Sequence, residues 1–419
     1  LTLQAGRSIT LGSSIVTDNG ALTLIANDHL ANGVIDHDRE AGDAEIVMAG
    51  GVSINAGAGT VTIDLRQGIG KTNSGYGDVT LQAITAGNLN VYAANSINLL
   101  GAINLAEGGT ALIRADEDKL GDGTITFSGG GSLGFGDDGR QAGTALLYYY
   151  PEAGYTNPKK FGSFINGGNW FADGVVTASR PGVNGDAAFM LIHNVVDLQN
   201  AIGDDGAGTH TDTSWTTRKD AARSYALSQD IDASDTRNWN SGAGFASMVL
   251  PTSTSSYGFN GLFDGHGHVI DGLVINRPAQ YWISLIPFVN EGTVRQIGLT
   301  NVDFTGNVNT AGIAAGLQSP NALLEQVYVT GRIESNQRAG GLVASMAGGT
   351  IRQSWTAAVV RAQSSGQTIA VGGLVGSMVG SSAKQIIQSY SLGPVIDASG
   401  IYAGGLVGDV SDGSTLTIS

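Results

Sequence analysis

The chain has 419 residues, of which 64 are glycine, 8 are proline and none is cysteine. Its 36 Asp and Glu residues outnumber its 21 Lys and Arg residues, so the formal net charge is −15 and the surrounding field repels nucleic acid and anionic lipid. The absence of cysteine excludes disulfides, thiolate metal sites and cysteine nucleophiles. No apolar run approaches the roughly 20 residues of a membrane span. Neither nucleic acid nor membrane insertion is therefore expected.

The first segment, residues 1–147, is a series of short predicted strands. Apolar and polar residues alternate, which is typical of strands with one buried and one wet face, and Gly, Ala or Asn separates the strands. The clearest examples are residues 52–55, 61–65, 79–82, 89–92 and 97–99. The chain begins directly on such a strand, without a signal peptide, so we expect an interior piece of a longer exported protein.

An acidic stretch in this segment contains Asp116, Glu117, Asp118 and Asp122. Carboxylates this close in the sequence could supply oxygen ligands to a divalent cation. Clusters of like charge are more often solvated loops. We therefore interpret the stretch as a loop and assign no metal to it.

The middle segment, residues 148–255, departs from the strand pattern. It opens on turn-rich sequence with aromatic residues that could stack on sugar rings. These candidate glycan-binding residues are Tyr148, Tyr149, Tyr150, Tyr155 and Trp170. The alternative, which we favour, is that the rings pack over the flank of the neighbouring strands and cover apolar surface there.

A short helix is predicted further along the middle segment. Asn194 can cap its start, Gly203 can close it, and the apolar residues between them share one face. Residues 216–224 could form a second helical turn or two. We therefore predict an irregular, partly helical insertion here.

A second group of oxygen-bearing side chains follows at Asp230, Asp232, Asp235 and Asn238. They could bind calcium, but neither the spacing of a calcium-binding helix-loop-helix nor a glycine-aspartate nonapeptide repeat is present. Aspartate side chains that accept hydrogen bonds from the backbone amides of a turn explain them more simply. We predict no metal and no cofactor for the chain.

The last segment, residues 256–419, carries a clear internal repeat. Its core is a Gly-Gly-Leu-Val unit in which Gly341-Leu342 recurs as Gly373-Leu374 and again as Gly405-Leu406, 32 residues apart each time. A second unit runs in phase with it, because residues 292–296 reappear as residues 349–353. Repeats of roughly this length without intervening helices are typical of solenoids.

The repeat predicts an all-β fold, a right-handed parallel β-helix. Each short strand would pair with its equivalent one coil away, about 4.8 Å distant. Like residues would then stack in the core, so we expect Leu342, Leu374 and Leu406 to lie one above another. Glycine is expected at the corners, where it supplies positive φ and lets backbones approach closely.

A β-helix enzyme acting on polysaccharides is the strongest rival interpretation, because such an enzyme shares the architecture. It would need carboxylates and a base on one face. Asp264, His266, His268 and Asp271 are the densest such cluster. Their alternation with glycine is more typical of a tight turn between two strands, so we predict no catalytic residues.

Several passages resemble known bacterial exoproteins. Residues 189–202 and 225–240 look like a passage of large adhesins, and residues 259–278 lead into repeats that resemble the GLUG motif. The run Tyr148-Tyr149-Tyr150-Pro151 and the first strands resemble the filamentous-haemagglutinin family of two-partner secretion exoproteins. Together these passages cover most of the chain.

The resemblance implies a secreted Gram-negative surface protein, exported through an outer-membrane transporter and used for attachment, aggregation or biofilm formation. The amino-terminal secretion domain of that family, with its Asn-Pro-Asn-type motif, is missing here, since the one Asn-Pro pair is Asn157-Pro158. We therefore expect a non-catalytic shaft segment of an adhesin. A module that binds host or bacterial glycans and a polysaccharide lyase or hydrolase remain the alternatives.

Overall fold

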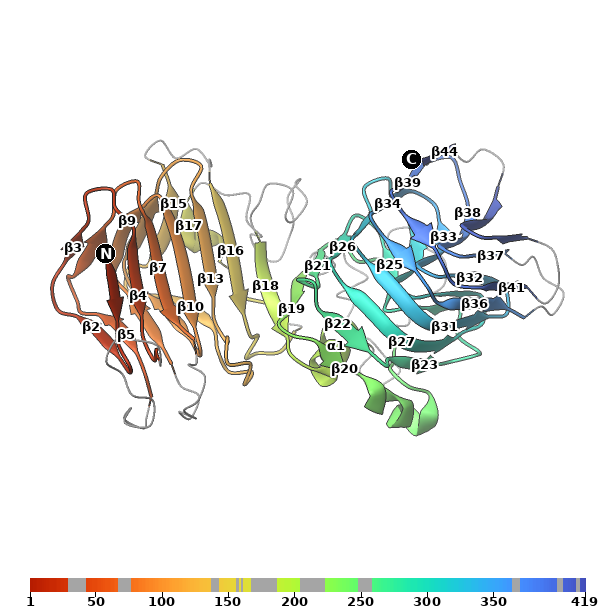
Figure 1. The fold of residues 1–419 in the computed structure, drawn as a ribbon, viewed down its shortest axis with the longest axis horizontal. Coiled ribbons are helices and arrows are strands. Elements are labelled where there is room, and N and C mark those ends of the chain that lie inside the picture. The colour runs from red at the N-terminus through yellow and green to blue at the C-terminus, as the bar shows by residue number, and fades with distance from the viewer. Residues whose placement is uncertain are drawn as a thin grey trace. The chain divides into compact units, whose positions relative to one another are not determined.

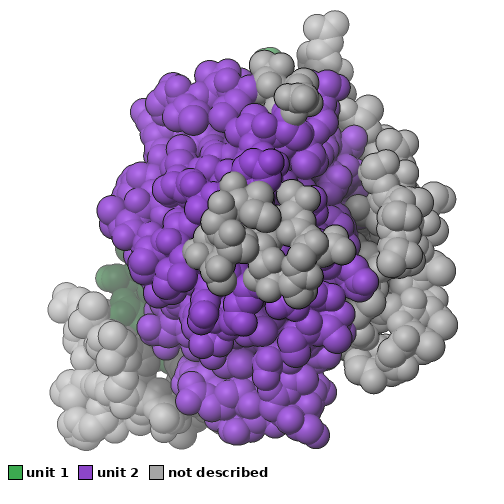
Figure 2. Space-filling model, turned by 90° about the vertical axis from the view of Figure 1, so that its right-hand side faces the viewer, with its two compact units in different colours: residues 1–191 green, residues 192–419 purple. Residues whose placement is uncertain are grey.

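The computed structural model describes residues 1–28, 43–66, 77–136, 143–155, 158–159, 161–166, 187–203, 223–247, 258–363, 370–397, 402–411 and 415–419. They form two compact units, Leu1–Leu191 and Ile192–Ser419 (Figure 2). The boundary falls inside the predicted middle segment, whose limits at residues 148 and 255 stay a prediction. None of the helices formed by the described residues has the length and apolar character needed to cross a bilayer.

Unit 1 consists of three parallel sheets that the chain visits in a repeating order (Figure 1). Sheet 1A contains β1 (Thr2–Gln4), β4 (Leu22–Ile25), β7 (Thr60–Leu65), β10 (Asn88–Ala93), β13 (Thr110–Arg114), β16 (Thr144–Tyr149) and β18 (Ala187–Ile192). Sheet 1B contains β2 (Ile9–Leu11), β5 (Ile46–Met48), β8 (Val79–Leu81), β11 (Ile97–Leu99) and β14 (Ile125–Phe127). Sheet 1C contains β3 (Ile15–Val16), β6 (Ser53–Asn55), β9 (Ala83–Ala86), β12 (Ala102–Leu105), β15 (Ser132–Phe135) and β17 (Ile165–Asn166), the last preceded by a 3-10 turn at Gly162–Phe164.

Consecutive strands, one from each sheet, form a repeating set that we call a rung. Each strand pairs in parallel with its equivalent in the next rung, as β7 does with β10, β8 with β11, and β9 with β12. Parallel pairing between neighbours requires the chain to make a long circuit before it returns, and here that circuit consists of strands in other sheets. The described part of the chain is thus all-β with long parallel sheets, compatible with a β-helix or another solenoid.

The core of unit 1 consists of ladders of like residues. On sheet 1C, Ile54 is aligned with Ile84, Ile84 with Ile103 and Ile103 with Leu133, and all four side chains are buried. Burying an aliphatic side chain of this size stabilises a fold by about 1.5–3 kcal/mol. The period-two alternation seen in the sequence is therefore the inward and outward alternation of these strands.

The strands of unit 2 lie in four parallel sheets. Sheet 2A contains β19 (Ser224–Leu227), β21 (Leu262–Asp264), β26 (Thr293–Arg295), β30 (Leu323–Glu325), β34 (Gly349–Arg352), β39 (Ala383–Ile387) and β44 (Thr415–Ile418). Sheet 2B contains β20 (Ile231–Asp232), β22 (Val269–Asp271), β23 (Val274–Asn276), β27 (Gly298–Thr305), β31 (Tyr328–Ser335), β35 (Trp355–Thr356), β36 (Val359–Ala362), β40 (Tyr390–Ser391) and β41 (Val395–Asp397). Sheet 2C contains β24 (Trp282–Ile283), β28 (Asn309–Ala311), β32 (Arg338–Gly340), β37 (Ala370–Gly372) and β42 (Ala403–Gly404). Sheet 2D contains β25 (Ile286–Val289), β29 (Ala314–Leu317), β33 (Val343–Met346), β38 (Val375–Met378) and β43 (Val407–Val410).

The Gly-Gly-Leu-Val units form the corner between sheets 2C and 2D. The backbone N–H of Leu342 donates to the carbonyl of Leu374 at 3.0 Å, and that of Leu374 donates to the carbonyl of Leu406 at 2.9 Å. Leu342 and Leu374 are fully buried, and Leu406 is half-buried. The three leucines therefore occupy equivalent positions of successive rungs.

The glycines at this corner are needed for close approach between backbones. A Cβ on Gly341 would lie 2.2 Å from the carbonyl oxygen of Gly373, and a Cβ on Gly373 would lie 2.0 Å from that of Gly405. Neither Gly341 nor Gly373 has a positive φ. The expectation that these glycines supply positive φ was therefore wrong at this corner, where the tight spacing of adjacent rungs excludes a side chain.

A different corner of the rung has residues in the left-handed conformation, and glutamine occupies it. Gln296, Gln326, Gln353 and Gln388 follow the strands of sheet 2A and have φ between 48° and 53°. The side-chain amide of Gln296 donates to that of Gln326 at 3.2 Å, and Gln353 donates to Gln388 at 3.4 Å. A left-handed conformation is costly for a residue other than glycine. These amide contacts between rungs offset part of that cost.

The predicted helix is present as α1 (Val195–Ile202), and its cap is as expected. The Asn194 side chain accepts hydrogen bonds from the backbone N–H groups of Val196 and Asp197, both at 2.9 Å. A 3-10 segment, η3 (Ser234–Gly242), follows β20. Of the second predicted helical stretch, residues 216–222 lie outside the described residues, and Ser224 begins strand β19.

Candidate functional site

Three of the aromatic residues predicted to stack on sugars, Tyr148, Tyr149 and Tyr155, are packed inside unit 1. Tyr148, Tyr149 and Tyr155 are each at most 4% exposed, and Tyr150 is half-buried. The Tyr148 ring stacks on Phe189 with centroids 4.7 Å apart, and the Tyr155 hydroxyl donates to the carbonyl of Leu191 at 2.5 Å. Buried rings cannot stack on a sugar, so Tyr148, Tyr149 and Tyr155 do not form a binding platform. Trp170 lies outside the described residues.

The acidic stretch after β13 forms a tight loop. Carboxylate oxygens of Asp116, Asp118 and Asp122 lie within 4.8 Å of one another, whereas Glu117 is bound by Arg114 at 2.6 Å. Asp116 is 1% exposed and has φ of 61°, and its Oδ1 accepts hydrogen bonds from the N–H groups of Gly121 and Gly123. The expectation of a wholly solvated loop was therefore wrong for Asp116, which holds the loop closed from inside.

The electrostatics of this loop are unfavourable. Burial raises the pKa of Asp118 to about 7, and burial together with the charge of Asp116 raises the pKa of Asp122. Asp118 Oδ2 and Asp122 Oδ1 are buried without a hydrogen-bond partner. Three carboxylates could supply part of the ligand set of a calcium ion, which takes six to eight oxygens. The loop contacts of Asp116 account for that residue without an ion.

The densest acid and histidine cluster of the sequence is divided among three sets of contacts, and the first brings His266 Nε2 to 3.7 Å from Asp264 Oδ2. Asp264 is 1% exposed and accepts a hydrogen bond from Arg295 Nε at 2.7 Å. His268 Nδ1 lies 3.1 Å from Asp230 Oδ1. Asp271 Oδ1 accepts from the Thr300 hydroxyl at 2.5 Å and from the Asn301 side chain at 2.7 Å. In these contacts each acid is bound to side chains of the protein.

Hydrogen bonds from backbone N–H groups support the predicted role of Asp230 and Asp232 in turns. Asp232 Oδ1 accepts from the N–H of Ser234 at 2.9 Å, and the hydrogen bond from the Ser234 hydroxyl lowers the pKa of Asp232. Asp230 Oδ1 accepts from the N–H of Val269 at 2.9 Å. Among the described residues, the one group of three acids close enough to share a metal ion is Asp116, Asp118 and Asp122.

A charged ladder that sequence reasoning did not identify runs along sheet 2A. Asp264, Arg295, Glu325 and Arg352 are aligned on successive strands with alternating sign. Arg295 Nη2 lies 2.6 Å from Asp264 Oδ2, and Arg352 Nη2 lies 2.5 Å from Glu325 Oε1. The residue spacing within the repeats could have revealed this ladder once the rungs were aligned.

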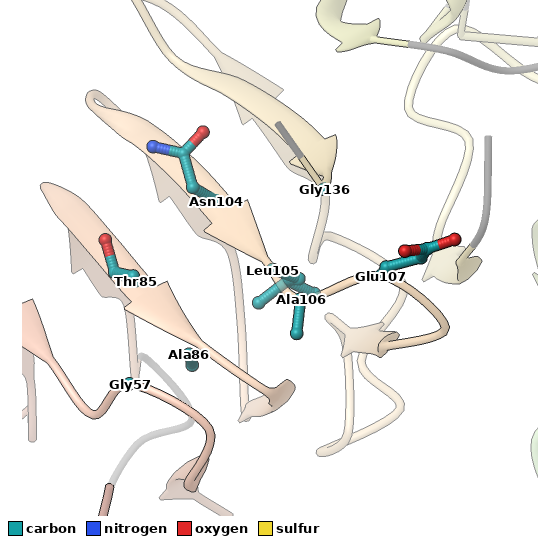
Figure 3. Close-up of a pocket in the computed structure, with 8 residues that line it drawn as sticks. All are labelled: Gly57, Thr85, Ala86, Asn104, Leu105, Ala106, Glu107 and Gly136. Atoms are coloured by element: carbon teal, nitrogen blue, oxygen red, sulfur yellow. The ribbon is translucent and has the colours of Figure 1, made fainter. Parts of the chain in front are cut away.

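A surface groove on unit 1 was also missed from the sequence (Figure 3). Its volume is about 500 Å³, and its lining includes Thr85, Asn104 and Glu107. Figure 3 shows Thr85 and Asn104 projecting to the same side from neighbouring strands, with Glu107 on the turn after β12. Alternation predicts that such residues face outward, but it does not predict that a hollow forms between them.

Comparisons with known proteins place the chain only coarsely. No family model matches it. Over 123 residues, 29% of this chain, it is 37% identical to halomucin from Haloquadratum walsbyi (strain DSM 16790 / HBSQ001), of which the match spans 1%. A crystal structure from Bacteroides ovatus, provisionally assigned as an immunoglobulin A1 protease, is 20% identical with a TM-score of 0.40, over 55% of this chain and 64% of that one. At this TM-score the likeness bears on neither fold nor activity.

Proposed function

We propose that this chain is a shaft segment of a very large secreted surface protein of the adhesin type, built as a right-handed parallel β-helix and without catalytic activity. The observation that carries the proposal is the parallel pairing of equivalent strands from rung to rung inside each unit. Core residues stack on like residues, and many of the charged and polar groups on the outer faces bind partners in the next rung. These contacts hold neighbouring rungs together.

Such an arrangement suits a mechanical role. In a repeat fold, each rung contacts mainly its neighbours, so stability is approximately a sum of rung terms and interface terms. A longer shaft therefore needs only more rungs. The halomucin match supports a very long parent chain, because the matched region is 1% of that protein.

The route of export is part of the same proposal. The resemblance to filamentous-haemagglutinin-like exoproteins and to GLUG repeats supports secretion through a two-partner outer-membrane transporter. Attachment, aggregation and biofilm formation are the roles that this resemblance supports. A surface or secreted location fits the acidic, cysteine-free composition.

The proposal is tested by removing one complete repeat. Deletion of residues 342–373 joins Gly341 to Leu374 and removes the 32 residues that separate equivalent positions. The matched control deletes residues 342–357, which removes half of that repeat. In a shaft, the first variant should keep the strand signal per residue in circular dichroism and the cooperative melt of the parent, whereas the control should lose part of that strand signal and melt at a lower temperature because the rungs on either side of the cut fall out of register.

The same proteins should be incubated with a panel of polysaccharides, and newly released reducing ends and unsaturated products should be measured. A shaft releases neither. Product release, or equal loss of structure in the two deletions, would contradict the proposal.

A further inference from the structure

We propose that the groove on unit 1 lined by Thr85, Asn104 and Glu107 binds a neutral oligosaccharide. The groove lies where β9 and β12 end and the chain leaves sheet 1C, because Ala86 and Leu105 are the last residues of these strands. Its volume of about 500 Å³ lies within the range of about 300–1,000 Å³ that ligand pockets occupy. This inference concerns a specific ligand site and does not depend on the shaft role.

The polar groups of the groove are available to a ligand. Thr85 is aligned with Asn104 on the neighbouring strand, so the two side chains are spaced by about 4.8 Å. Both are exposed, as is Glu107 on the following turn. In the part of the chain that the structure describes, none of these three side chains takes part in a hydrogen bond or ion pair, so a ligand would not have to displace a partner among those residues.

These groups match the chemistry of sugar hydroxyls. A threonine hydroxyl and an asparagine amide both donate and accept hydrogen bonds, and a carboxylate accepts them. A sugar hydroxyl also does both. Leu105 and Ala86 are buried beside these groups, and Ala106 is exposed. The exposed methyl group of Ala106 can contact the C–H face of a sugar ring while the sugar hydroxyls reach the polar groups.

The same observations exclude other ligand classes. An anionic ligand is disfavoured because Glu107 is the charged residue of the lining and the chain carries a formal net charge of −15. A purely apolar ligand would strip water from Thr85, Asn104 and Glu107 without replacing their hydrogen bonds. An added peptide strand has no free edge here, since β9 pairs with β6 and β12, and β12 pairs with β9 and β15.

The outward row beside the groove extends along the rungs. Asn55 is aligned with Thr85, and Asn104 is aligned with Gly134, whose missing side chain leaves that position open. The polar side chains therefore repeat at the spacing of the strands. An extended oligosaccharide lying across β6, β9 and β12 could meet one side chain per rung and continue over the open position on β15.

The test uses the full chain on an array of neutral oligosaccharides, namely glucans, mannans and galactans, together with sialylated and sulfated glycans. The neutral glycan retained best is then titrated by calorimetry. The binding variants are the double change Thr85→Ala with Asn104→Ala, and Ala106→Trp, which fills the groove. Matched controls are Thr80→Ala on sheet 1B and Asn90→Ala on sheet 1A, which remove the same groups from outward positions elsewhere.

Retention of a neutral glycan by the parent and both controls, with at least about a tenfold rise in Kd for the double variant and for Ala106→Trp, is the expected result. Circular dichroism checks that each variant is folded. The proposal is overturned if no neutral glycan is retained, if anionic glycans are preferred, or if folded groove variants bind as tightly as the parent. Glycan cleavage would overturn the non-catalytic shaft and leave the groove assignment to be judged by the variants.

Discussion

Single residues matter most in this chain where one rung meets the next or where charge is buried. Gly341 and Gly373 leave no room for a side chain, because the backbone of the adjacent rung fills that space. Asp116, Asp118 and Asp122 bring like charges together in a partly buried loop. In both places we expect a change of one side chain to alter the free energy of unfolding.

The glycine corner gives a prediction with an internal control. In Gly373→Ala the new methyl group meets the carbonyl of Gly405, so we expect a loss of about 2 kcal/mol or more in unfolding free energy. Gly405→Ala changes the same motif, but nothing lies within 4 Å of the new methyl group. That control should stay within about 0.5 kcal/mol of the parent. Urea denaturation measures both, and equal losses would argue against close approach as the cause.

The acidic loop predicts how stability depends on pH. The pKa of Asp118 is about 7 in the folded chain and 3.8 ordinarily, so the folded state retains a proton that the unfolded state releases. Stability therefore falls as pH rises from about 4 to about 7 and then levels off. Asp118→Asn should melt about 2–4 °C higher than the parent at pH 8 and nearly the same at pH 4.

Melting curves followed by circular dichroism at these two pH values measure the difference. Glu107→Gln, which neutralises an exposed carboxylate in the same unit, is the control and should show no such gain. A gain of equal size at both pH values would argue against a titrating carboxylate.

At the scale of elements, strand pairing is reinforced by contacts between side chains on successive strands. Outward charges on β21, β26, β30 and β34 alternate in sign, and the glutamine amides that follow the strands of sheet 2A bind one another. Like charges on adjacent strands would repel each other. The alternation therefore favours the observed pairing of strands.

The buried member of the charged ladder gives the third prediction. Arg295→Met leaves the buried carboxylate of Asp264 without its guanidinium partner, and removing one partner of a buried ion pair typically costs about 3–5 kcal/mol. Because His266 remains 3.7 Å from Asp264, we expect a loss at or below the lower end of that range. Arg332→Met removes an exposed partner of Asp303 and Glu334, and because Glu334 keeps Arg361 at 3.4 Å the loss should be about 1 kcal/mol or less. Denaturant unfolding compares the two. Restoration of stability in Arg295→Met combined with Asp264→Asn would identify the unpaired charge as the cause.

At the scale of the whole molecule, the protection of backbone amides from hydrogen exchange should depend on the position of their rung. β33 pairs with strands on both sides, whereas β43 pairs with β38. Tyr402 and Val410 on the β43 rung are also more than 40% exposed. An interior strand must therefore lose pairing on two sides before it opens, whereas an outer strand must lose pairing on one side.

Amide hydrogen exchange measures this difference. We expect backbone amides of β33 to exchange at least about tenfold more slowly than those of β43, because opening an interior strand breaks pairing on two sides. Equal protection in dilute solution would argue against rung-by-rung stability in this unit.

The sequence by itself determined the short alternating strands, the repeat that stacks Leu342 above Leu374, and the Asn194 cap of α1. These features depend on periodicity and on local hydrogen bonding, which a single sequence displays. Tertiary structure decided the rest. Tyr149 is buried because neighbouring rungs cover it, whereas they leave Thr85 open, so that it lines a groove. Glutamine occupies the left-handed corner because amides from adjacent rungs bind each other there. Such outcomes depend on which rungs become neighbours, and the spacing along one strand does not contain that information.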